Sequence, residues 1–140
     1  MPPMASPAGP RRRPPWWALA ASAAALAVLL WAALPAPAPE PSVLLGCWRR
    51  EGEEYRLRVR EVRPGGAAEV EYFNPRPIRV GEARTDTAGG RRTLRVVLRD
   101  ENYPGSTYTL AYDPEGDRLT GEYYQAVHGI TIPVVFLREK

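Results

Sequence analysis

The sequence of 140 residues has 19 Lys and Arg against 16 Asp and Glu. Three of the arginines (11–13) and one glutamate (Glu40) precede residue 41. Residues 41–140 therefore hold 16 basic and 15 acidic side chains, with a net charge of +1. This balance excludes the concentrated basic face that phosphate binding needs, and we expect no nucleic-acid partner. With one cysteine and one histidine, the chain has no internal disulfide, and a zinc site of ordinary ligand number is not expected.

The N-terminal part of the chain combines a basic tail with an apolar run. Residues 1–15 are rich in Pro, Ala and Arg without periodicity, which predicts a disordered basic tail. Residues 16–34 carry no charge, and as a helix they would extend for about 28 Å, close to the hydrocarbon thickness of a bilayer. Trp16, Trp17 and Trp31 lie near the ends of the run, where indole rings favour the membrane interface. We predict one transmembrane signal-anchor helix over residues 16–34, which makes the membrane a partner.

The residues that flank this run predict its orientation. The arginines at 11–13 lie on the N-terminal side only, so the positive-inside rule places the N-terminus in the cytoplasm. We expect a single-pass protein of the bacterial inner membrane, with its C-terminal domain in the periplasm or outside the cell. Residues 35–42 alternate proline with small residues, which predicts an extended Pro/Ala-rich linker between the anchor and that domain.

Two alternatives for the N-terminal part stay open. A cleaved signal peptide also has a basic region, an apolar run and a small-residue cleavage site, and residues 36–38 (APA) have that form. Proline follows both cutting positions there, and its ring hinders an extended protease substrate. Residues 44–47 (LLGC) resemble the lipobox of bacterial lipoproteins, whose cysteine becomes the acylated N-terminus. Cleavage would leave the domain secreted or, with Cys47 acylated, a lipoprotein.

From residue 43 onward, polarity alternates with a period of two and is interrupted every eight to twelve residues by turn-forming residues. Leu94, Val96 and Leu98 alternate with charged neighbours in the clearest example. We predict an all-β domain over residues 43–140, a small antiparallel up-and-down barrel of about eight strands, because closure avoids long exposed edges. The predicted strands cover residues 43–50, 53–63, 68–72, 78–84, 93–100, 107–112, 119–126 and 130–138.

Three positions within this pattern carry more specific predictions. The arginines of the second strand face the glutamates at 69 and 71 across a hairpin, where opposite charges help to set the register. Residues 102–105, with Pro and Gly in sequence, predict a turn. Pro133 lies within the last strand, and because proline cannot donate to a sheet it predicts an edge position or a bulge.

Two resemblances follow from these residues. Gly46 and Trp48 at the start of the first strand, with Arg138 at the end of the last, resemble the G-x-W pattern of lipocalins and calycins. That likeness implies that the tryptophan closes the barrel floor beneath the arginine and that all three residues are structural. The domain also resembles small exported bacterial proteins of unknown function, which share N-Y-P-G-S-T-Y (residues 102–108 here) and L-x-G-x-Y-Y (residues 119–124). This second likeness implies no activity.

An acidic turn is the nearest approach to a metal site. Asp113, Glu115 and Asp117 have the one, three, five spacing of a calcium loop. Arg118 stands where such a loop requires glycine, however, and Tyr124 stands where it requires the closing glutamate. We interpret the segment as a hairpin turn, and we predict no metal ligand and no cofactor.

The remaining reactive side chains lack the partners that catalysis needs. His128 lies in a predicted surface turn, and no basic group is positioned near Cys47 in the local sequence to lower the pKa of its thiol. Ser106 lacks the G-x-S-x-G elbow of a hydrolase nucleophile. We therefore predict no catalytic residue and a protein that is not an enzyme.

The tyrosines are the remaining indication of function. The alternation points five of them inward and Tyr124 outward, and buried phenols need partners from side chains, water or a ligand. A filled core and a small amphipathic pocket both remain open, since an eight-stranded barrel accommodates either. The inward tyrosines are Tyr55, Tyr72, Tyr108, Tyr112 and Tyr123.

Two functions are compatible with this pattern. The first is a membrane-tethered module that binds a small apolar or amphipathic ligand in the barrel mouth, lined by Trp48, Tyr72, Tyr108 and Tyr123. The second is an envelope interaction module with a solid core and no ligand, which contacts another protein through its arginine-rich outer faces and the loop around Tyr103.

Overall fold

A computed structural model describes residues 1–5, 8–12 and 36–140, and Ala36–Lys140 form one compact unit. The predicted transmembrane segment at 16–34 lies outside the described residues, as do residues 6–7, 13–15 and 35. Within the described ranges, no helix has both the length and the apolar character that a membrane crossing requires.

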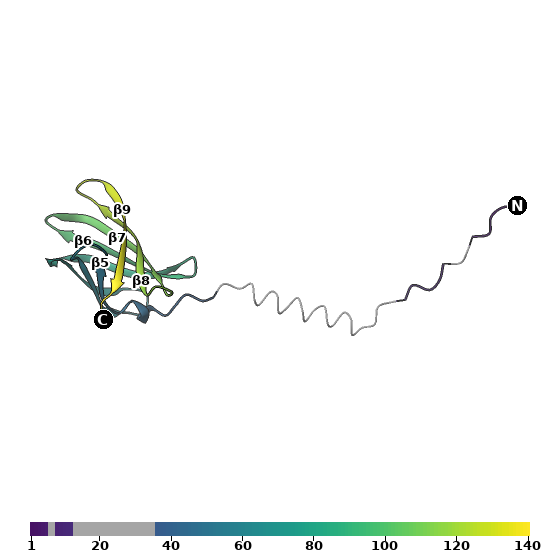
Figure 1. Ribbon diagram of the computed structural model, residues 1–140, viewed down its shortest axis with the longest axis horizontal. Coiled ribbons are helices and arrows are strands. Elements are labelled where there is room, and N and C mark those ends of the chain that lie inside the picture. Colours follow the sequence, from purple (N-terminus) through teal and green to yellow (C-terminus); the bar gives the residue numbers. More distant parts are fainter. Residues whose placement is uncertain (6–7, 13–35) are drawn as a thin grey trace. The chain divides into compact units, whose positions relative to one another are not determined.

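The compact unit is a single antiparallel sheet of nine strands that curves into a nearly closed barrel (Figure 1). Strands that follow one another in the sequence pair with each other, except β4 and β5, and the first strand also pairs with the last, which confirms the predicted all-β, up-and-down barrel. The elements are η1 (Pro41–Leu44), β1 (Gly46–Arg50), β2 (Arg56–Val62), β3 (Ala68–Asn74), β4 (Arg76–Ile78), β5 (Val80–Ala88), β6 (Arg91–Asp100), β7 (Tyr103–Asp113), β8 (Arg118–Gln125) and β9 (Ile130–Arg138).

The barrel closes in two places. On one side β1 pairs with β9 from Trp48, opposite Arg138, to Arg50, opposite Phe136. On the other side β3 approaches β5 through a bridge between Ala67 and Arg84, beside which the amide of Thr85 donates to the carbonyl of Gly66 at 2.7 Å. The first pairing joins the two halves of the sheet and the second brings its two edges together, so the inner face encloses one core.

The number of strands differs from the prediction because the expected strand at 78–84 is two strands. β4 pairs with β3, whereas β5 pairs with β6, and Arg79 separates them. The amide of Arg79 donates to Asp100 Oδ2 at 2.9 Å, and its carbonyl accepts from the amide of Arg99 at 2.9 Å. The backbone at Arg79 is therefore fully hydrogen-bonded, and the chain passes from one half of the sheet to the other at this corner.

Two further predictions of local structure were wrong. The first strand begins at Gly46 and not at residue 43, because η1 occupies the preceding residues, with Pro41 in its first turn. The turn expected at 102–105 is shorter, since β7 already begins at Tyr103. Pro104 pairs with Arg99 in the sheet, and Gly105 takes a φ of 86°, which lets the strand continue through a position unfavourable for other residues.

Charge pairs on the outer face agree with the predicted hairpin register. Arg58 and Arg60 approach Glu71 at 3.5 and 3.2 Å, and Arg60 also lies 3.9 Å from Glu69. Because these side chains are exposed, solvent screens each pair and its contribution to stability is small. Their main consequence is that the arginines on the outer face of β2 are largely neutralised by glutamates from β3.

Pro133 lies at a free edge, as its sequence position predicted. β1 pairs with β9 only from residue 136 onward, so in the described part of the chain residues 130–134 have no strand on the side that faces β1. On the other side, Pro133 lies opposite Glu122 of β8. The missing amide of proline therefore costs no hydrogen bond of the sheet.

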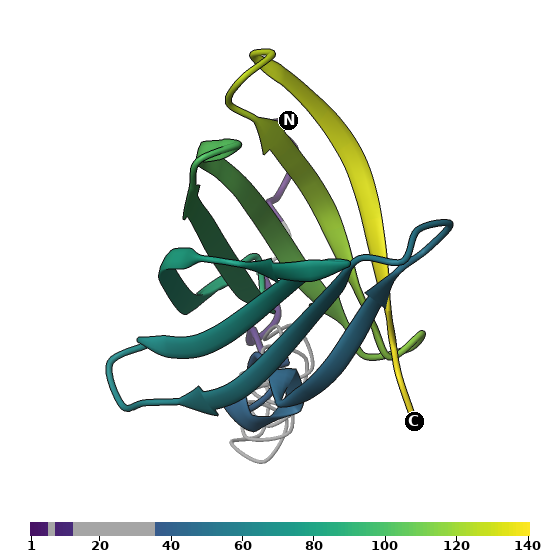
Figure 2. The ribbon, with the colours of Figure 1, turned by 90° about the vertical axis from the view of Figure 1, so that its left-hand side faces the viewer.

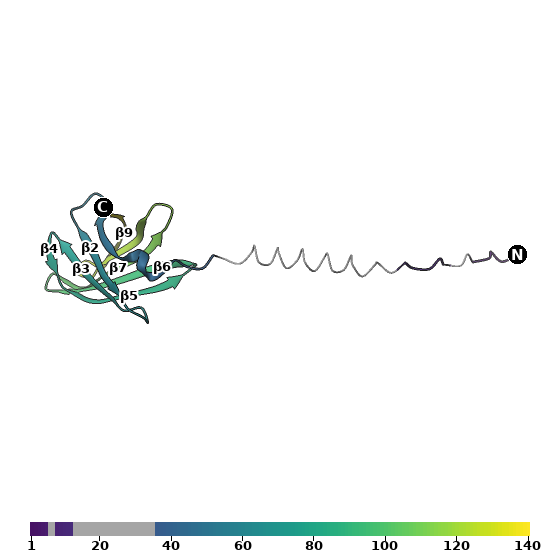
Figure 3. The same cartoon turned by 90° about the horizontal axis from the view of Figure 1, so that it is seen from below.

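The segment with η1 lies across one end of the barrel (Figures 2 and 3), and we refer to this end, which also contains Trp48 and Arg138, as the closed end. Leu44 of η1 and Trp48 of β1 are both 0% exposed, and the indole Nε1 donates to the carbonyl of Leu44 at 2.9 Å. Tyr112 meets the indole ring edge to face, at 6.2 Å between centroids. Leu44, Trp48 and Tyr112 therefore pack together at this end.

Arg138 contacts the closed end from its outer side and stabilises it. Its guanidinium lies 4.1 Å from the Trp48 ring centroid, the contact that the lipocalin resemblance implies, and adds about 1 kcal/mol or more of cation–π attraction. The same group donates to the carbonyls of Val43 at 2.6 Å and Leu45 at 2.7 Å. Its fourth partner is Asp117, whose carboxylate accepts from Nε at 2.8 Å. Arg138 thus ties the segment around η1 to the end of β9 and to the turn before β8.

Candidate functional site

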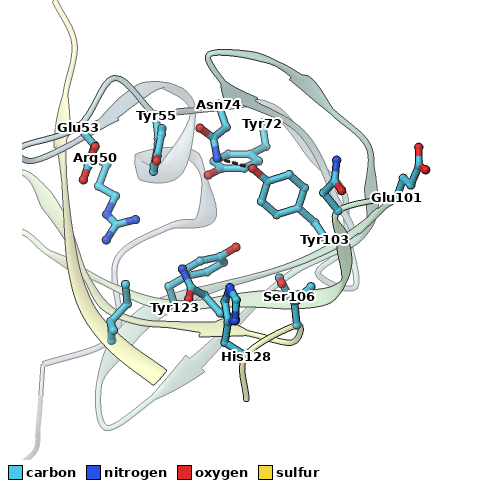
Figure 4. Close-up of a pocket in the computed structure, with 14 residues that line it drawn as sticks. Arg50, Glu53, Tyr55, Tyr72, Asn74, Glu101, Tyr103, Ser106, Tyr123 and His128 are labelled. Carbon is cyan, nitrogen blue, oxygen red and sulfur yellow. Dashed lines mark hydrogen bonds between the residues drawn. The ribbon is translucent and has the colours of Figure 1, made fainter. Parts of the chain in front are cut away.

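The opposite end of the barrel is open and contains a cavity of about 630 Å³ (Figure 4). This volume lies in the range of about 300 to 1,000 Å³ that small-molecule sites occupy. The hairpins β1–β2, β6–β7 and β8–β9 all turn at this end, and we call the cavity the mouth. It is lined by Arg50, Glu53, Tyr55, Tyr72, Asn74, Glu101, Asn102, Tyr103, Ser106, Tyr123, Gln125, Val127, His128 and Ile132.

Tyrosine rings form the floor of the mouth. Tyr108, from the middle of β7, is 0% exposed and stacks on Tyr123 of β8, with 4.3 Å between centroids and 22° between planes. Tyr72 of β3 meets Tyr108 edge to face at 5.4 Å, and their hydroxyl oxygens are 3.0 Å apart. Phe136 packs beneath Tyr108 at 5.3 Å. The core is solid below this layer, so a ligand can enter only the upper part of the barrel.

Burial determines the protonation of these phenols. It raises the pKa of Tyr72, Tyr108 and Tyr123 above the ordinary value for tyrosine, because a phenolate loses its hydration inside the barrel. All three are therefore neutral at physiological pH. The mouth offers hydroxyl groups and aromatic faces and no negative charge from these residues.

The two motifs of the bacterial resemblance meet in one wall of the mouth. Residues 102–108 and 119–124 lie on the paired strands β7 and β8, where Tyr108 faces Tyr123 in the register. Gly121 allows this pairing to be close, since a Cβ there would overlap the carbonyl oxygen of Thr109. The motifs thus specify a closely paired hairpin with tyrosines on its inner face.

Hydrogen bonds fix the polar groups of the mouth. Asn74 Nδ2 donates to the hydroxyl of Tyr103 at 2.7 Å, which connects β3 to β7 across the opening (Figure 4). The hydroxyl of Ser106, buried at the start of β7, accepts from the amide of Ala126 at 3.1 Å and holds the β8–β9 hairpin. Both hydroxyls are therefore held in place before any ligand binds.

Arg50 is the basic side chain of the mouth. It is partly buried and points into the cavity, with its guanidinium carbon 5.5 Å from the centroid of the Tyr55 ring. Among the described residues, no carboxylate forms an ion pair with it, whereas Arg58 and Arg60 on the outer face have such partners. The inner wall of the mouth therefore carries a positive charge.

The structure brings together two of the four residues predicted to line a ligand. Tyr72 and Tyr123 line the mouth. Tyr108 lies in the floor, covered by its neighbours, and Trp48 lies at the closed end beneath Arg138. Strand alternation assigned the three tyrosines to the inner face and the lipocalin resemblance placed Trp48 in the barrel floor, but alternation does not report depth along the barrel.

Sequence reasoning missed Arg50 and the polar groups held by hydrogen bonds. A signal for Arg50 was present, because it follows Trp48 by two positions on the same strand and so shares its inward face. Asn74 and Ser106 carried no comparable signal, since their roles depend on strands that are distant in sequence.

The other chemical candidates lie apart from one another. His128 is exposed on the rim of the mouth, and Cys47 accepts a hydrogen bond from Arg58 Nε at 3.4 Å on the outer face. In the predicted turn, Asp113 and Asp117 are each bound by an arginine at 2.8 Å, which lowers the pKa of both carboxyls. Within the described residues, no cluster of His, Cys, Asp and Glu has a geometry that could hold a metal ion.

No protein family model, curated protein or solved structure matches this chain. The nearly closed antiparallel barrel is consistent with a calycin-like fold. The mouth combines an aromatic floor, hydroxyls held by hydrogen bonds and the guanidinium of Arg50.

The paired hydroxyls of Tyr72 and Tyr108 give a test of the floor. Replacing either tyrosine with phenylalanine is expected to lower the free energy of unfolding by about 1 to 2 kcal/mol, because the remaining buried hydroxyl loses its partner. The double variant is expected to lose clearly less than the sum of the two, since no unsatisfied hydroxyl remains. Urea denaturation of the four proteins measures this coupling, and additive losses would contradict the hydrogen bond.

Proposed function

We propose that this protein binds a small amphipathic molecule in the mouth of its barrel and that it performs no catalysis. The observation that best supports binding is the cavity of about 630 Å³ at the open end, above the stacked tyrosine rings of the floor. Aromatic faces suit an apolar body, while Arg50 and the hydroxyls of Tyr103 and Ser106 suit a polar group. The fixed hydrogen bonds of the rim support binding without large rearrangement.

We further propose that residues 16–34 tether the barrel to the bacterial inner membrane, with the barrel in the periplasm. The length of the apolar run and the arginines at 11–13 support this placement, and so does the resemblance to small exported proteins. The closed end argues against processing at Cys47, because that cleavage would remove Leu44 from the core. Cleavage near residues 36–38 would leave η1 and every strand intact.

The binding function predicts that a molecule accompanies the protein from its own host. Native mass spectrometry of the full chain, extracted in a nonionic detergent, is expected to show one small molecule per chain. Ile132→Trp is expected to lose it, because Ile132 lines the mouth and the larger side chain would occupy the cavity. Thr131→Trp, one position away on the exposed face of β9, is the matched control and is expected to retain the molecule.

Circular dichroism establishes that both variants are folded. If the unaltered chain carries no small molecule, or if Ile132→Trp carries as much as Thr131→Trp, the mouth is not the binding site.

The free edge of β9 favours a second candidate, an envelope interaction module. On its side toward β1, the stretch 130–134 has no strand partner, so its free backbone groups other than the missing amide of Pro133 are available to a partner. Tyr124, Val127 and Ile130 of the same hairpin are 43%, 61% and 49% exposed. We favour this surface over the outer face of β2 as the contact region, since Arg58 and Arg60 there are paired with glutamates. The same spectra would then show a bound protein instead of a small molecule.

A further inference from the structure

We propose, on the basis of the binding function above, that the ligand of the mouth is an anion: a molecule with a planar apolar body and a carboxylate that pairs with Arg50. The inference rests on three features of the mouth. These are the isolation of Arg50, the distribution of charge around the cavity, and the free hydrogens of its fixed hydroxyls.

The fold holds Arg50 in place and directs it inward. Its backbone lies at the last ladder position between β1 and β9, opposite Phe136, and its amide donates to the carbonyl of Tyr55 at 2.8 Å. The neighbouring Arg49 points to the outer face and is exposed. Successive side chains of a strand point to opposite faces, so the backbone of β1 directs the charge of Arg50 into the cavity and that of Arg49 away from it.

The other charged groups of the mouth lie on its rim. Glu53 and Glu101 are exposed, as is His128, whereas Arg50 is partly buried. Water screens the rim carboxylates more effectively than it screens a group within the cavity. The guanidinium of Arg50 is therefore the formal charge that lies deepest in the mouth, where a bound group would meet it first. Arg50 also acts against the burial that raises the pKa of Tyr123, which agrees with a guanidinium close to that phenol.

The hydroxyls around the cavity are placed as donors. Tyr103 accepts from Asn74, and Ser106 accepts from the amide of Ala126. Accepting uses one lone pair of each oxygen and does not engage its O–H hydrogen, so each hydroxyl can still donate. A carboxylate offers about four acceptor positions and donates nothing, which complements a wall of donors and one guanidinium.

The shape of the cavity selects the body of the ligand. Tyr55, Tyr72 and Tyr123 present rings on different sides of the opening, and Ile132 adds an aliphatic surface. Flat aromatic or fused-ring bodies pack well against such rings. A two-ring carboxylic acid fits the volume and combines both requirements, so 2-naphthoate and its neutral isostere 2-naphthamide are suitable probes.

Isothermal titration calorimetry with the full chain in a nonionic detergent tests the inference. The unaltered protein is expected to bind 2-naphthoate about tenfold more tightly than 2-naphthamide, the effect of one charge-assisted hydrogen bond in a partly exposed site. Arg50→Gln is expected to lose this preference, and Arg50→Lys is expected to keep part of it. Arg49→Gln removes the same charge from the outer face of the same strand and is expected to keep the full preference.

The outcomes separate this inference from the binding function. Equal affinity for the two probes, or a preference that survives Arg50→Gln, overturns the anionic ligand and leaves a neutral amphipathic one. A preference lost equally in Arg49→Gln and Arg50→Gln also overturns it, because the net charge of the domain would then be responsible. Binding of neither probe, with no small molecule found in the native spectra, overturns both proposals.

Discussion

Replacing Trp48 with alanine is expected to lower the free energy of unfolding by about 4 kcal/mol. The indole is 0% exposed and touches three elements: it donates to Leu44, lies beneath Arg138 and meets Tyr112. Alanine would leave a cavity at the closed end and would remove the aromatic face on which the guanidinium rests. Because small domains are stable by only about 5 to 15 kcal/mol, this is a large fraction of the total.

Urea denaturation followed by circular dichroism measures the loss. Val127→Ala is the control, since Val127 is 61% exposed and its truncation is expected to change stability by no more than about 0.5 kcal/mol. A loss below about 1.5 kcal/mol for Trp48→Ala would show that the closed end does not depend on the indole.

A domain that begins at Cys47 is expected to be less stable than one that begins at residue 36 by about 5 kcal/mol. The shorter fragment lacks Leu44, whose burial contributes about 3 kcal/mol. It also lacks the carbonyls that accept from Trp48 and Arg138, three hydrogen bonds of about 1 kcal/mol each before relaxation. Trp48 and Arg138 would then lie over an open end of the barrel.

The comparison of fragments 36–140 and 47–140 in urea tests this expectation and also bears on export. Equal stability of the two would mean that η1 is dispensable, and processing of residues 44–47 as a lipobox would then be compatible with the fold. Labelling of the expressed full chain with radioactive palmitate gives an independent answer, since incorporation at Cys47 contradicts the proposed membrane anchor.

Alternation of polarity was sufficient to predict most of the barrel. The last strand, 130–138, was predicted with its observed bounds, and the charge pairs between β2 and β3 follow from the same pattern. The corner at Arg79 could not be predicted, because it depends on hydrogen bonds to Asp100 and Arg99, some twenty residues away. Likewise, residues 43 and 44 were predicted to lie in the first strand but belong to the 3-10 helix η1, which begins at Pro41.

The sequence predicted which side chains of the candidate site point into the barrel, but not how far along the barrel axis each one lies. Tyr72, Tyr108 and Trp48 were all expected to point inward and all do, yet they lie at the mouth, in the floor and at the closed end, respectively. Depth depends on how strands are staggered around the barrel, which one sequence does not reveal. For Arg50, two sequence signals disagreed. Its spacing of two positions from Trp48 indicates an inward side chain, as observed, whereas the charge of an arginine in an alternating strand suggests an outward one.

The measurement that tests the central claim most directly is the site of photo-crosslinking by a diazirine derivative of 2-naphthoate on the full chain. Occupancy of the mouth predicts labelled peptides from the start of β7 and from the β8–β9 hairpin, around Tyr103 and Ile132, with labelling suppressed by excess 2-naphthoate and by Ile132→Trp. Labelling that falls on the outer face of β2 and β3, or that excess 2-naphthoate does not suppress, would contradict the claim that the open end of this barrel is a binding site.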